Sequence, residues 1–334
     1  MKILFLGHLG GNSKYQYNNF KKKGIKIDHL DIEFFFRKVK ILKFLFNNIS
    51  PIIFSPIIFL FLKIKIQKKY NLVYVTNGEY FSKNSVFYLK KICNKIFLCC
   101  FDNPFVKRDN KKWNLLRKSI HLFDHVIYIQ PSRKKYTKIY NIKNYSIFYP
   151  HYEKSVHKKI KNIKKKYDVV FVGTWFLDRA IFLKKLIDKG LNIKIFGSRW
   201  NKDSEYKKYK KFFKIKNFNS LEYSKIINSS HIALCLFSKE NEDTITTRSA
   251  EIPAIGTFML TKKTNDHVKF LKHKKHTVYF NSVNQCIKYC KYYLKNYTLR
   301  EKIAKQANIK IRSMKLTNED FIKKVLKIYE NKIL

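Results

Sequence analysis

Short apolar runs alternate with helix-like stretches from the start of the chain, and this alternation constrains the fold more than any other feature. In the first half, the runs are rich in Ile, Val, Leu, Phe and Tyr, as buried strands are, and stretches of helical length separate them. Strands that alternate with helices predict a parallel sheet. The runs therefore indicate one doubly wound α/β domain. They lie at residues 2–7, 25–32, 71–78, 95–102, 125–130 and 145–150.

The same alternation begins again after a basic segment, residues 153–166 (EKSVHKKIKNIKKK), which we interpret as a linker. One hydrophobic core seldom grows beyond about 250–300 residues, so a chain of 334 residues is expected to form two domains. We predict an N-terminal Rossmann-like domain over 1–152 and a C-terminal one over 167–334 that includes two final helices from about Val283. Their parallel sheets are expected to face each other across a cleft. The strands of the second domain are predicted at 167–175, 192–200, 231–237, 256–261 and 276–280.

Residues 44–62, FLFNNISPIIFSPIIFLFL, break the pattern because they carry no charge over nineteen positions and are flanked by Lys43, Lys63 and Lys65. Their length permits a membrane span. Two asparagines, two prolines and the need to connect two strands of one sheet argue against it. A buried helix pair fits best, and an apolar patch that dips into a lipid interface stays open as an alternative.

The formal net charge is +48, from 71 Lys and Arg against 23 Asp and Glu. Such a charge suits a polyanion partner or an acidic membrane surface. However, only nine of the basic residues are Arg, the side chain that binds phosphates and base edges in a bidentate manner. We therefore expect ordinary surface lysines first, a role at an anionic membrane surface as the second interpretation, and no nucleic-acid partner. The positive field still attracts anionic substrates.

Six cysteines lie inside apolar or helical patterns, with no Cys-x-x-Cys pair and no histidine at zinc spacing. They indicate reduced thiols and no metal site. The first residues, MKILFLGHLGG, predict a strand and not a secretory signal. We expect a cytoplasmic protein, with a peripheral location on the inner face of the membrane as the alternative.

Polar residues follow several predicted strands of the N-terminal domain. His8 lies in a Gly-rich turn after the first strand, Glu79 follows the third, Asp102 the fourth and His151 the sixth. Ligands of open parallel sheets bind beyond the carboxyl ends of the strands. These four residues are therefore candidates for chemistry, although each also suits a plain loop or helix cap.

Two strand ends of the C-terminal domain also carry candidates. VGTW places Gly173 and Thr174 after one strand, where a glycine lets a ligand approach and a hydroxyl can bind a phosphate or a sugar. FGSRW ends the next strand, which makes Arg199 a candidate, while Trp200 either stacks on a base or packs within its own domain.

The stretch EDTITTRSAEIPAIG, residues 242–256, provides the strongest candidates. Arg248 and Glu251 are three positions apart, so on a helix they share one face. Arg248 would donate paired hydrogen bonds to a diphosphate, and Glu251 would accept hydrogen bonds from ribose hydroxyls. The alternative is a surface ion pair worth at most about 1 kcal/mol.

Residues 167–318 resemble the spore-maturation (CgeB-like) glycosyltransferases, a branch of the GT-B enzymes. The resemblance rests on the strand that ends in Gly-Thr, the Arg-x-x-Glu-x-Pro-Ala core, the Phe-x-Leu-Thr strand and the Tyr-Tyr-Leu helix before an Arg. Ile255 and Gly256 stand where the family often has Cys-Gly. The resemblance implies a metal-independent transferase with no cofactor, whose donor substrate is a nucleotide sugar.

The resemblance also implies roles for individual residues. Glu251 is similar to the ribose-binding carboxylate, Arg248 to the diphosphate-binding cation, and Gly173 and Thr174 to the donor-side loop. The acceptor would be a glycan, a lipid-linked molecule or a protein in cell-surface or polysaccharide assembly. An inverting reaction would take its base from the N-terminal domain, where His8, Glu79, Asp102 and His151 are the candidates. The alternative function is a catalytically silent module that binds glycans or a membrane surface.

Overall fold

A computed structural model describes residues 1–331 of the chain and divides them into two compact units. Unit 1 comprises residues 1–149, 240–242 and the C-terminal residues from 318 on. Unit 2 comprises residues 150–239 and 243–317. Each unit contains a six-stranded sheet in which all neighbouring strands are parallel.

The sheet of unit 1 has the strand order β2-β1-β3-β4-β5-β6. The order reverses between β1 and β3, and the carboxyl ends of strands at such a switch point leave a crevice where ligands bind. All six strands predicted in this half are present. They are β1 (Lys2–Leu6), β2 (Lys26–Leu30), β3 (Tyr70–Thr76), β4 (Cys93–Cys100), β5 (His125–Tyr128) and β6 (Tyr145–Ile147).

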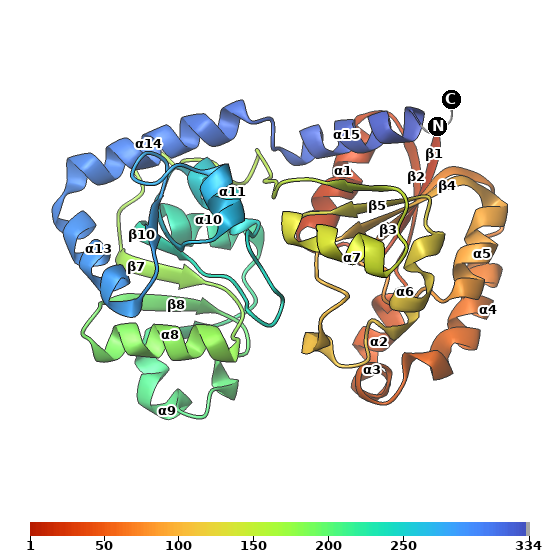
Figure 1. Cartoon of the computed structure of the whole chain (residues 1–334), viewed down its shortest axis with the longest axis horizontal. Coiled ribbons are helices and arrows are strands. Elements are labelled where there is room, and N and C mark those ends of the chain that lie inside the picture. The colour runs from red at the N-terminus through yellow and green to blue at the C-terminus, as the bar shows by residue number, and fades with distance from the viewer. Residues whose placement is uncertain (332–334) are drawn as a thin grey trace. The chain divides into compact units, whose positions relative to one another are not determined.

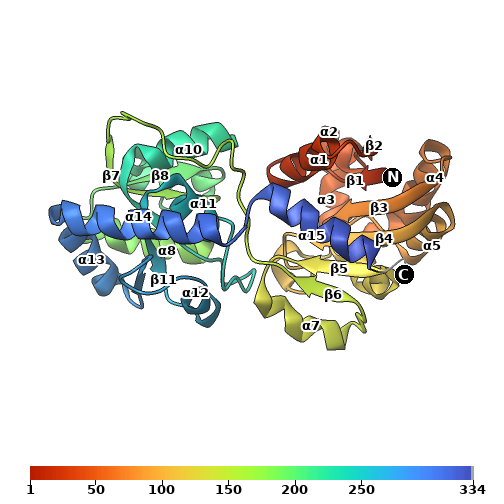
Figure 2. The ribbon, with the colours of Figure 1, turned by 90° about the horizontal axis from the view of Figure 1, so that it is seen from above.

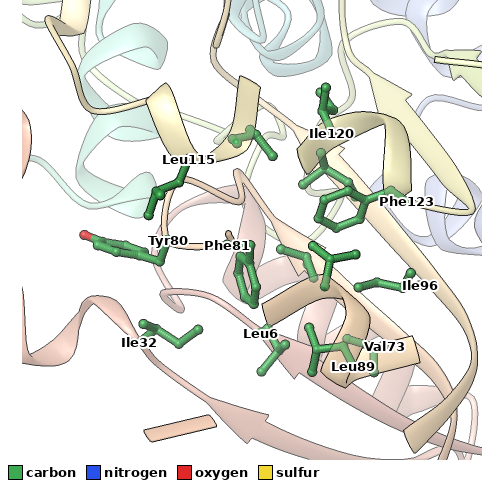
Figure 3. Packing of buried hydrophobic residues seen from close by; sticks show 14 of the residues in the cluster. Leu6, Ile32, Val73, Tyr80, Phe81, Leu89, Ile96, Leu115, Ile120 and Phe123 are labelled. Atoms are coloured by element: carbon green, nitrogen blue, oxygen red, sulfur yellow. The ribbon is translucent and has the colours of Figure 1, made fainter. Parts of the chain in front are cut away.

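Helices cover both faces of this sheet because successive strand residues point to opposite sides. Leu4 and Leu6 of β1 pack in one hydrophobic cluster, part of which Figure 3 shows, while Ile3 and Phe5 pack in the other. The helices are α1 (Asn12–Lys22), α2 (Glu33–Lys38), α3 (Lys40–Asn48), α4 (Ser55–Lys65), α5 (Lys83–Ile92), α6 (Asn114–Ser119), α7 (Lys134–Ile139) and α15 (Asn318–Glu330).

The last helix, α15, differs from the sequence prediction because it belongs to unit 1 and not to the C-terminal domain. It lies beside α1 (Figure 1). Its apolar residues Phe321, Ile322, Val325 and Tyr329 recur on one helical face and pack on Ile3 and other side chains of the unit 1 core. The sequence after Val283 also forms three helices and not the two predicted.

Unit 2 has the strand order β12-β11-β10-β7-β8-β9, which reverses between β7 and β10. The five strands predicted here are present. The sixth, β9, was not predicted because two of its three residues, Lys214 and Ile215, are exposed at the sheet edge. The strands are β7 (Tyr167–Val172), β8 (Ile193–Gly197), β9 (Phe213–Ile215), β10 (Ser230–Cys235), β11 (Phe258–Lys262) and β12 (Val278–Phe280).

Two hydrophobic clusters cover the two faces of the unit 2 sheet. One contains residues of α8 and α13, and the other contains residues of α10 and α11, on which α14 lies (Figure 2). The helices are α8 (Leu177–Asp188), α9 (Tyr206–Tyr209), α10 (Ser220–Asn228), α11 (Arg248–Ile255), α12 (Asn265–Phe270), α13 (Val283–Lys295) and α14 (Tyr297–Ser313).

The segment interpreted as a linker packs on unit 2 over much of its length. His157 is buried, the backbone amide of Ile160 donates to the Asn228 side chain, and the Lys165 ammonium donates to the carbonyl oxygens of Asn228 and Ser230. Its lysines mark a solvated surface, and the buried positions between them fix it in place.

Residues 44–62 form the end of α3, a 3-10 turn η1 (Pro51–Phe54) and most of α4. This is the helix pair that the sequence favours. Burial is incomplete, however, since the outward side chains of both helices are exposed. Within residues 1–331, no helix combines the length and the apolar character needed to cross a membrane.

Candidate functional site

Arg248 begins α11 and reaches the end of β7, which places it at the switch point of unit 2. Its Nε donates a 2.6 Å hydrogen bond to the carbonyl oxygen of Val172, the last residue of that strand. A Cβ at position 173 would lie 3.7 Å from a terminal nitrogen of Arg248. Because Gly173 has no side chain, a ligand can approach this guanidinium. The terminal nitrogens donate no hydrogen bond within residues 1–331.

A second guanidinium, that of Arg179 on α8, lies near Arg248. Arg179 is buried, donates to the carbonyl oxygens of Thr174 (3.3 Å) and Leu236 (3.5 Å), and rests on the Phe176 ring. Burial, and after it the charge of Arg248, lower the pKa of Arg179 to about 10. Within residues 1–331, neither guanidinium has a carboxylate oxygen within 4 Å.

This arrangement opposes stability in the absence of an anion. Two like charges at a partly desolvated site repel each other, and a cation at a helix N-terminus opposes the helix dipole. The N-terminus of α11 and the two guanidinium groups all favour negative charge at the same place. The chemistry of the site therefore suits a phosphate or diphosphate.

Glu251 lies one turn along α11 from Arg248, as the spacing predicted. Its carboxylate accepts no hydrogen bond within the described residues, and its side chain is 13% exposed. The Glu153 amide donates to Nδ1 of His157 (3.0 Å), so Nε2 of that ring carries the proton and faces Glu251 at 3.9 Å. An acceptor with spare lone pairs beside a cation pair suits a hydroxyl-rich ligand.

Tyr223 completes this group from α10. Burial raises the pKa of its phenol, and the Glu251 carboxylate adds to the rise while Arg248 opposes it. Its buried hydroxyl nevertheless makes no hydrogen bond of good geometry within residues 1–331. Arg248, Glu251 and Tyr223 therefore form one electrostatically connected cluster with unused hydrogen-bonding groups.

The remaining predicted donor-side residues lie at the neighbouring strand ends. The hydroxyls of Thr174 and Ser198 are 3.4 Å apart. Trp200 packs and does not stack on a ligand: it is fully buried, and its ring nitrogen donates to the carbonyl oxygen of Gly173 (2.9 Å). Arg199 is exposed in a left-handed turn, with φ of 69°.

Gly197 makes this close approach of two strand ends possible. Its φ is 144°, and a Cβ there would lie 2.1 Å from the carbonyl oxygen of Gly173. No L-amino acid side chain fits at that distance.

A hollow of about 350 Å³ lies beside Arg179, a volume in the range of small-molecule sites. Lys185, Lys239 and Lys262 add positive charge to its lining, and the stacked rings of Phe182 and Phe280 form an apolar wall (5.4 Å between centroids). Asp178 and Asp243 also line the hollow, so it continues from Arg179 along the carboxyl ends of β10, β11 and β12 with cations in excess over carboxylates.

Unit 1 has its own hollow, of about 150 Å³, at the β1/β3 switch point. His8 and Glu79, two of the four candidates for acid–base chemistry, line it together with Glu33. Nδ1 of His8 lies 3.4 Å from the Asp31 carboxylate, and Arg37 contacts both residues.

Glu79 in the same hollow is engaged in an ion pair. It is buried, and its carboxylate lies 3.1 Å from the Lys112 ammonium. Burial lowers the pKa of Lys112, but the carboxylates of Glu79 and Asp102 outweigh this and hold it above its usual value.

The other two candidates do not line this hollow. Asp102 pairs with Arg108 (3.2 Å), which also binds Asp109. His151 is buried and belongs to unit 2, where the next residue, Tyr152, forms an isolated bridge with Thr317. The chain enters unit 2 at Pro150, so His151 belongs to a different unit from the other three candidates.

Sequence reasoning missed Arg179, His157, Tyr223 and Asp31. A signal existed for Arg179: in a chain with nine arginines, one stands four residues beyond VGTW at the start of a helix. The other three are ordinary residues in polar or helical stretches, and only the folded chain brings them to the site.

Within the described residues, no three His, Cys, Asp or Glu side chains are arranged to hold a metal ion, and all six cysteines are free thiols.

Comparison with solved structures shows that the chain has the GT-B fold of glycosyltransferases. A sucrose-phosphate synthase from Thermosynechococcus elongatus superposes with a TM-score of 0.70 at 10% identity, covering 100% of this chain and 99% of that one. Anabaena HepE, solved in complex with UDP and glucose, gives 0.68 at 11% identity, with 99% and 100% covered. The phage T4 enzyme BGT in complex with UDP-glucose gives 0.62 at 16% identity, with 98% and 99% covered.

At the level of sequence, residues 176–326 match the family model described as glycosyl transferase-like. This range begins just after VGTW and includes Arg179, Arg248 and Glu251. No curated protein sequence matches the chain.

Proposed function

We propose that the protein is a glycosyltransferase that takes its donor sugar from a nucleoside diphosphate bound by unit 2. The observation that carries the proposal is the unpaired couple of Arg179 and Arg248 at the β7/β10 switch point, with the pKa of Arg179 lowered. A diphosphate between them would relieve the repulsion. The solved structures with the same fold that contain UDP or UDP-glucose support this choice.

The roles within the donor site follow from the chemistry of each group. Cleavage of the anomeric bond leaves one further negative charge on the diphosphate, which Arg179, Arg248 and the N-terminus of α11 would stabilise. Glu251 would accept hydrogen bonds from ribose hydroxyls, with the His157 ring 3.9 Å from its carboxylate. The two guanidinium groups supply the charge compensation that a bound metal ion supplies in other transferases.

Unit 1 would supply the base for an inverting reaction. In this assignment His8 accepts the proton of the acceptor hydroxyl, while Asp31 and Arg37, which both contact Nδ1, orient the ring. His8 is preferred to Glu79 and Asp102 because both carboxylates are held in ion pairs.

The finer assignment is to the spore-maturation branch, with an acceptor in cell-surface or polysaccharide assembly. It rests on the Arg-x-x-Glu-x-Pro-Ala core and the flanking motifs of residues 167–318. The acceptor would be a glycan, a lipid-linked molecule or a protein, in a cytoplasmic compartment or at the inner face of a membrane.

Thermal unfolding with a panel of nucleoside diphosphates tests the proposal. The matching nucleotide is expected to raise Tm at millimolar concentration in the wild type and to leave Tm unchanged in Arg248→Ala. If none of UDP, GDP, ADP, CDP or dTDP raises Tm, the proposed function is wrong.

A further inference from the structure

The outward side of α4 is apolar, which is unusual for a helix at the surface of a domain. Ile58 and Leu62 pack in the core of unit 1, while Ile57, Leu60 and Ile64 point outward with exposures of 67%, 57% and 58%. A surface helix normally presents charged and polar residues on that side. Here both sides are apolar, so the outward side has no role in the packing of unit 1.

The exposed apolar side chains continue over the preceding elements. Helix α3 and the turn η1 contact each other, and η1 contacts α4, which lies beside α5 (Figures 1 and 2). We call this region the α3–α4 surface. Its exposed apolar residues are Ile41, Phe44, Ile49, Ile52, Ile53, Ile57, Leu60 and Ile64. Isolated apolar side chains on a surface are common, but a cluster of this kind marks an interaction site.

The charged side chains within the segment that forms the α3–α4 surface have one sign. Residues 34–65 contain no acidic side chain, and Lys40, Lys63 and Lys65 are exposed beside the apolar residues. The Lys63 ammonium lies over the Phe59 ring (5.6 Å), with its aliphatic stem along the helix. Apolar side chains with lysines at their edge match a bilayer with anionic headgroups, where the apolar groups enter the acyl boundary and the ammonium groups stay with the phosphates.

We propose that the α3–α4 surface docks unit 1 on a bilayer that contains anionic phospholipid. Net charge supports this occupant over a second copy of the chain, because two molecules that each carry +48 repel each other. The docking does not depend on the proposed transferase activity.

The docking surface adjoins the hollow of unit 1 that contains His8. Glu33 lines this hollow and is ion-paired with Lys43 of α3 (2.9 Å). Tyr80, also in its lining, stacks on Phe36 and contacts Phe46 of α3 (both 4.9 Å between centroids). Docking would therefore bring the hollow to the membrane, which selects a lipid-linked molecule among the three acceptor classes. This consequence rests on the proposed function.

Vesicle sedimentation of the full chain tests the docking. Wild type is expected to bind vesicles of phosphatidylglycerol and phosphatidylcholine. The double variant Ile53→Asp, Ile57→Asp is expected to lose affinity for these vesicles by at least about tenfold, since each isoleucine that docking buries in the bilayer contributes strongly to the free energy of binding. The matched control, Ile139→Asp with Ile309→Asp, changes two equally exposed isoleucines elsewhere and should bind within about twofold of wild type, as expected of exposed positions outside the interface.

A second variant separates the charge from the apolar contribution. Lys63→Gln with Lys65→Gln should weaken binding by about fivefold per lysine and reduce its salt dependence. Unchanged Tm values establish that the variants fold. The proposal is overturned if wild type fails to bind anionic vesicles, if the isoleucine variant binds as well as wild type, or if light scattering shows a dimer that this variant dissociates. Nucleotide binding by the same samples is a separate readout, so failure of docking and failure of the proposed function remain distinguishable.

Discussion

The guanidinium groups of Arg179 and Arg248 lie close enough that the charge of one lowers the pKa of the other, although they come from different helices of unit 2. Such a pair raises the free energy of the empty protein and lowers that of a complex with an anion. Stability and binding should therefore respond in opposite directions when one of the two charges is removed.

Arg179→Met is the substitution that reveals this opposition. It removes a buried charge without a carboxylate partner and keeps most of the side-chain volume, so Tm of the empty protein should stay the same or rise. The Kd for the nucleoside diphosphate should increase about tenfold to hundredfold, the value of one or two charge-assisted hydrogen bonds. Calorimetric titration and thermal unfolding measure the two effects.

Arg300→Met is the control for this substitution. Arg300 is also buried, but its hydrogen bonds to the carbonyl oxygens of Tyr293 (2.6 Å) and Leu294 (3.1 Å) are shorter than those that Arg179 donates (3.3 and 3.5 Å). Arg300→Met should therefore lower Tm and leave the Kd for the nucleoside diphosphate unchanged. If Arg179→Met instead behaves like Arg300→Met, Arg179 is a structural residue.

His8→Ala should lower kcat about 10²-fold to 10⁴-fold, the usual contribution of a general base. The Kd for the donor nucleotide should stay the same, because His8 belongs to unit 1. Asp31→Asn should lower kcat less and shift its pH profile. His121→Ala, at an exposed histidine of the same unit, serves as the control. Unchanged turnover in His8→Ala would assign the proton transfer to another group.

Gly197→Ala should disrupt the switch point of unit 2. The added Cβ would lie 2.1 Å from the carbonyl oxygen of Gly173, and φ is 144°. We expect a loss of more than about 3 kcal/mol in the free energy of unfolding, together with weaker nucleotide binding. Gly190→Ala, at a φ of 78° with no atom within 4 Å of the new Cβ, should cost only about 1 kcal/mol. Urea unfolding compares the two, and equal losses would show that the close approach of the strand ends is not rigid.

His267 predicts how stability depends on pH. Burial lowers the pKa of its ring from 6.5 to about 3. Between pH 6.5 and pH 3, the imidazole is therefore protonated in the unfolded chain and neutral in the folded chain. The free energy of unfolding consequently falls as pH decreases from 6.5 toward 3. The slope contributed by one such group is about 1.4 kcal/mol per pH unit. His267→Gln should have a shallower slope by this amount between pH 6 and pH 4.5 in urea titrations, whereas parallel slopes would mean that the ring is protonated in the folded state.

The sequence predicted eleven of the twelve strands because most of these strands are buried between layers of helices and leave an apolar run. The edge strand β9 left none, since Lys214 and Ile215 are exposed. The placement of α15 could not be predicted either: its apolar face has the same pattern as that of any terminal helix, and the contact partners in unit 1 lie some 300 positions earlier.

The candidate site shows a similar division. Arg248 and Glu251 were predictable because their spacing on one helix is a local property. The pairing of Arg248 with Arg179 depends on how β7 and β10 lie side by side, and the approach of His157 to Glu251 depends on a polar segment that folds back on unit 2. Such contacts arise from topology, which a local pattern does not contain.

The central claim is that Glu251 and the arginine pair bind one nucleoside diphosphate, with the ribose at the carboxylate. The most direct test is to measure calorimetric Kd values for UDP and 2′,3′-dideoxy-UDP with wild type and with Glu251→Gln. If a nucleoside diphosphate with another base binds better than UDP, that nucleotide and its dideoxy form are used instead. Wild type should bind UDP more tightly than dideoxy-UDP by about tenfold or more, the value of hydrogen bonds to a charged group. Glu251→Gln should lose most of this preference. Its Kd for dideoxy-UDP should remain that of wild type. An equal preference for ribose in both proteins would contradict the account.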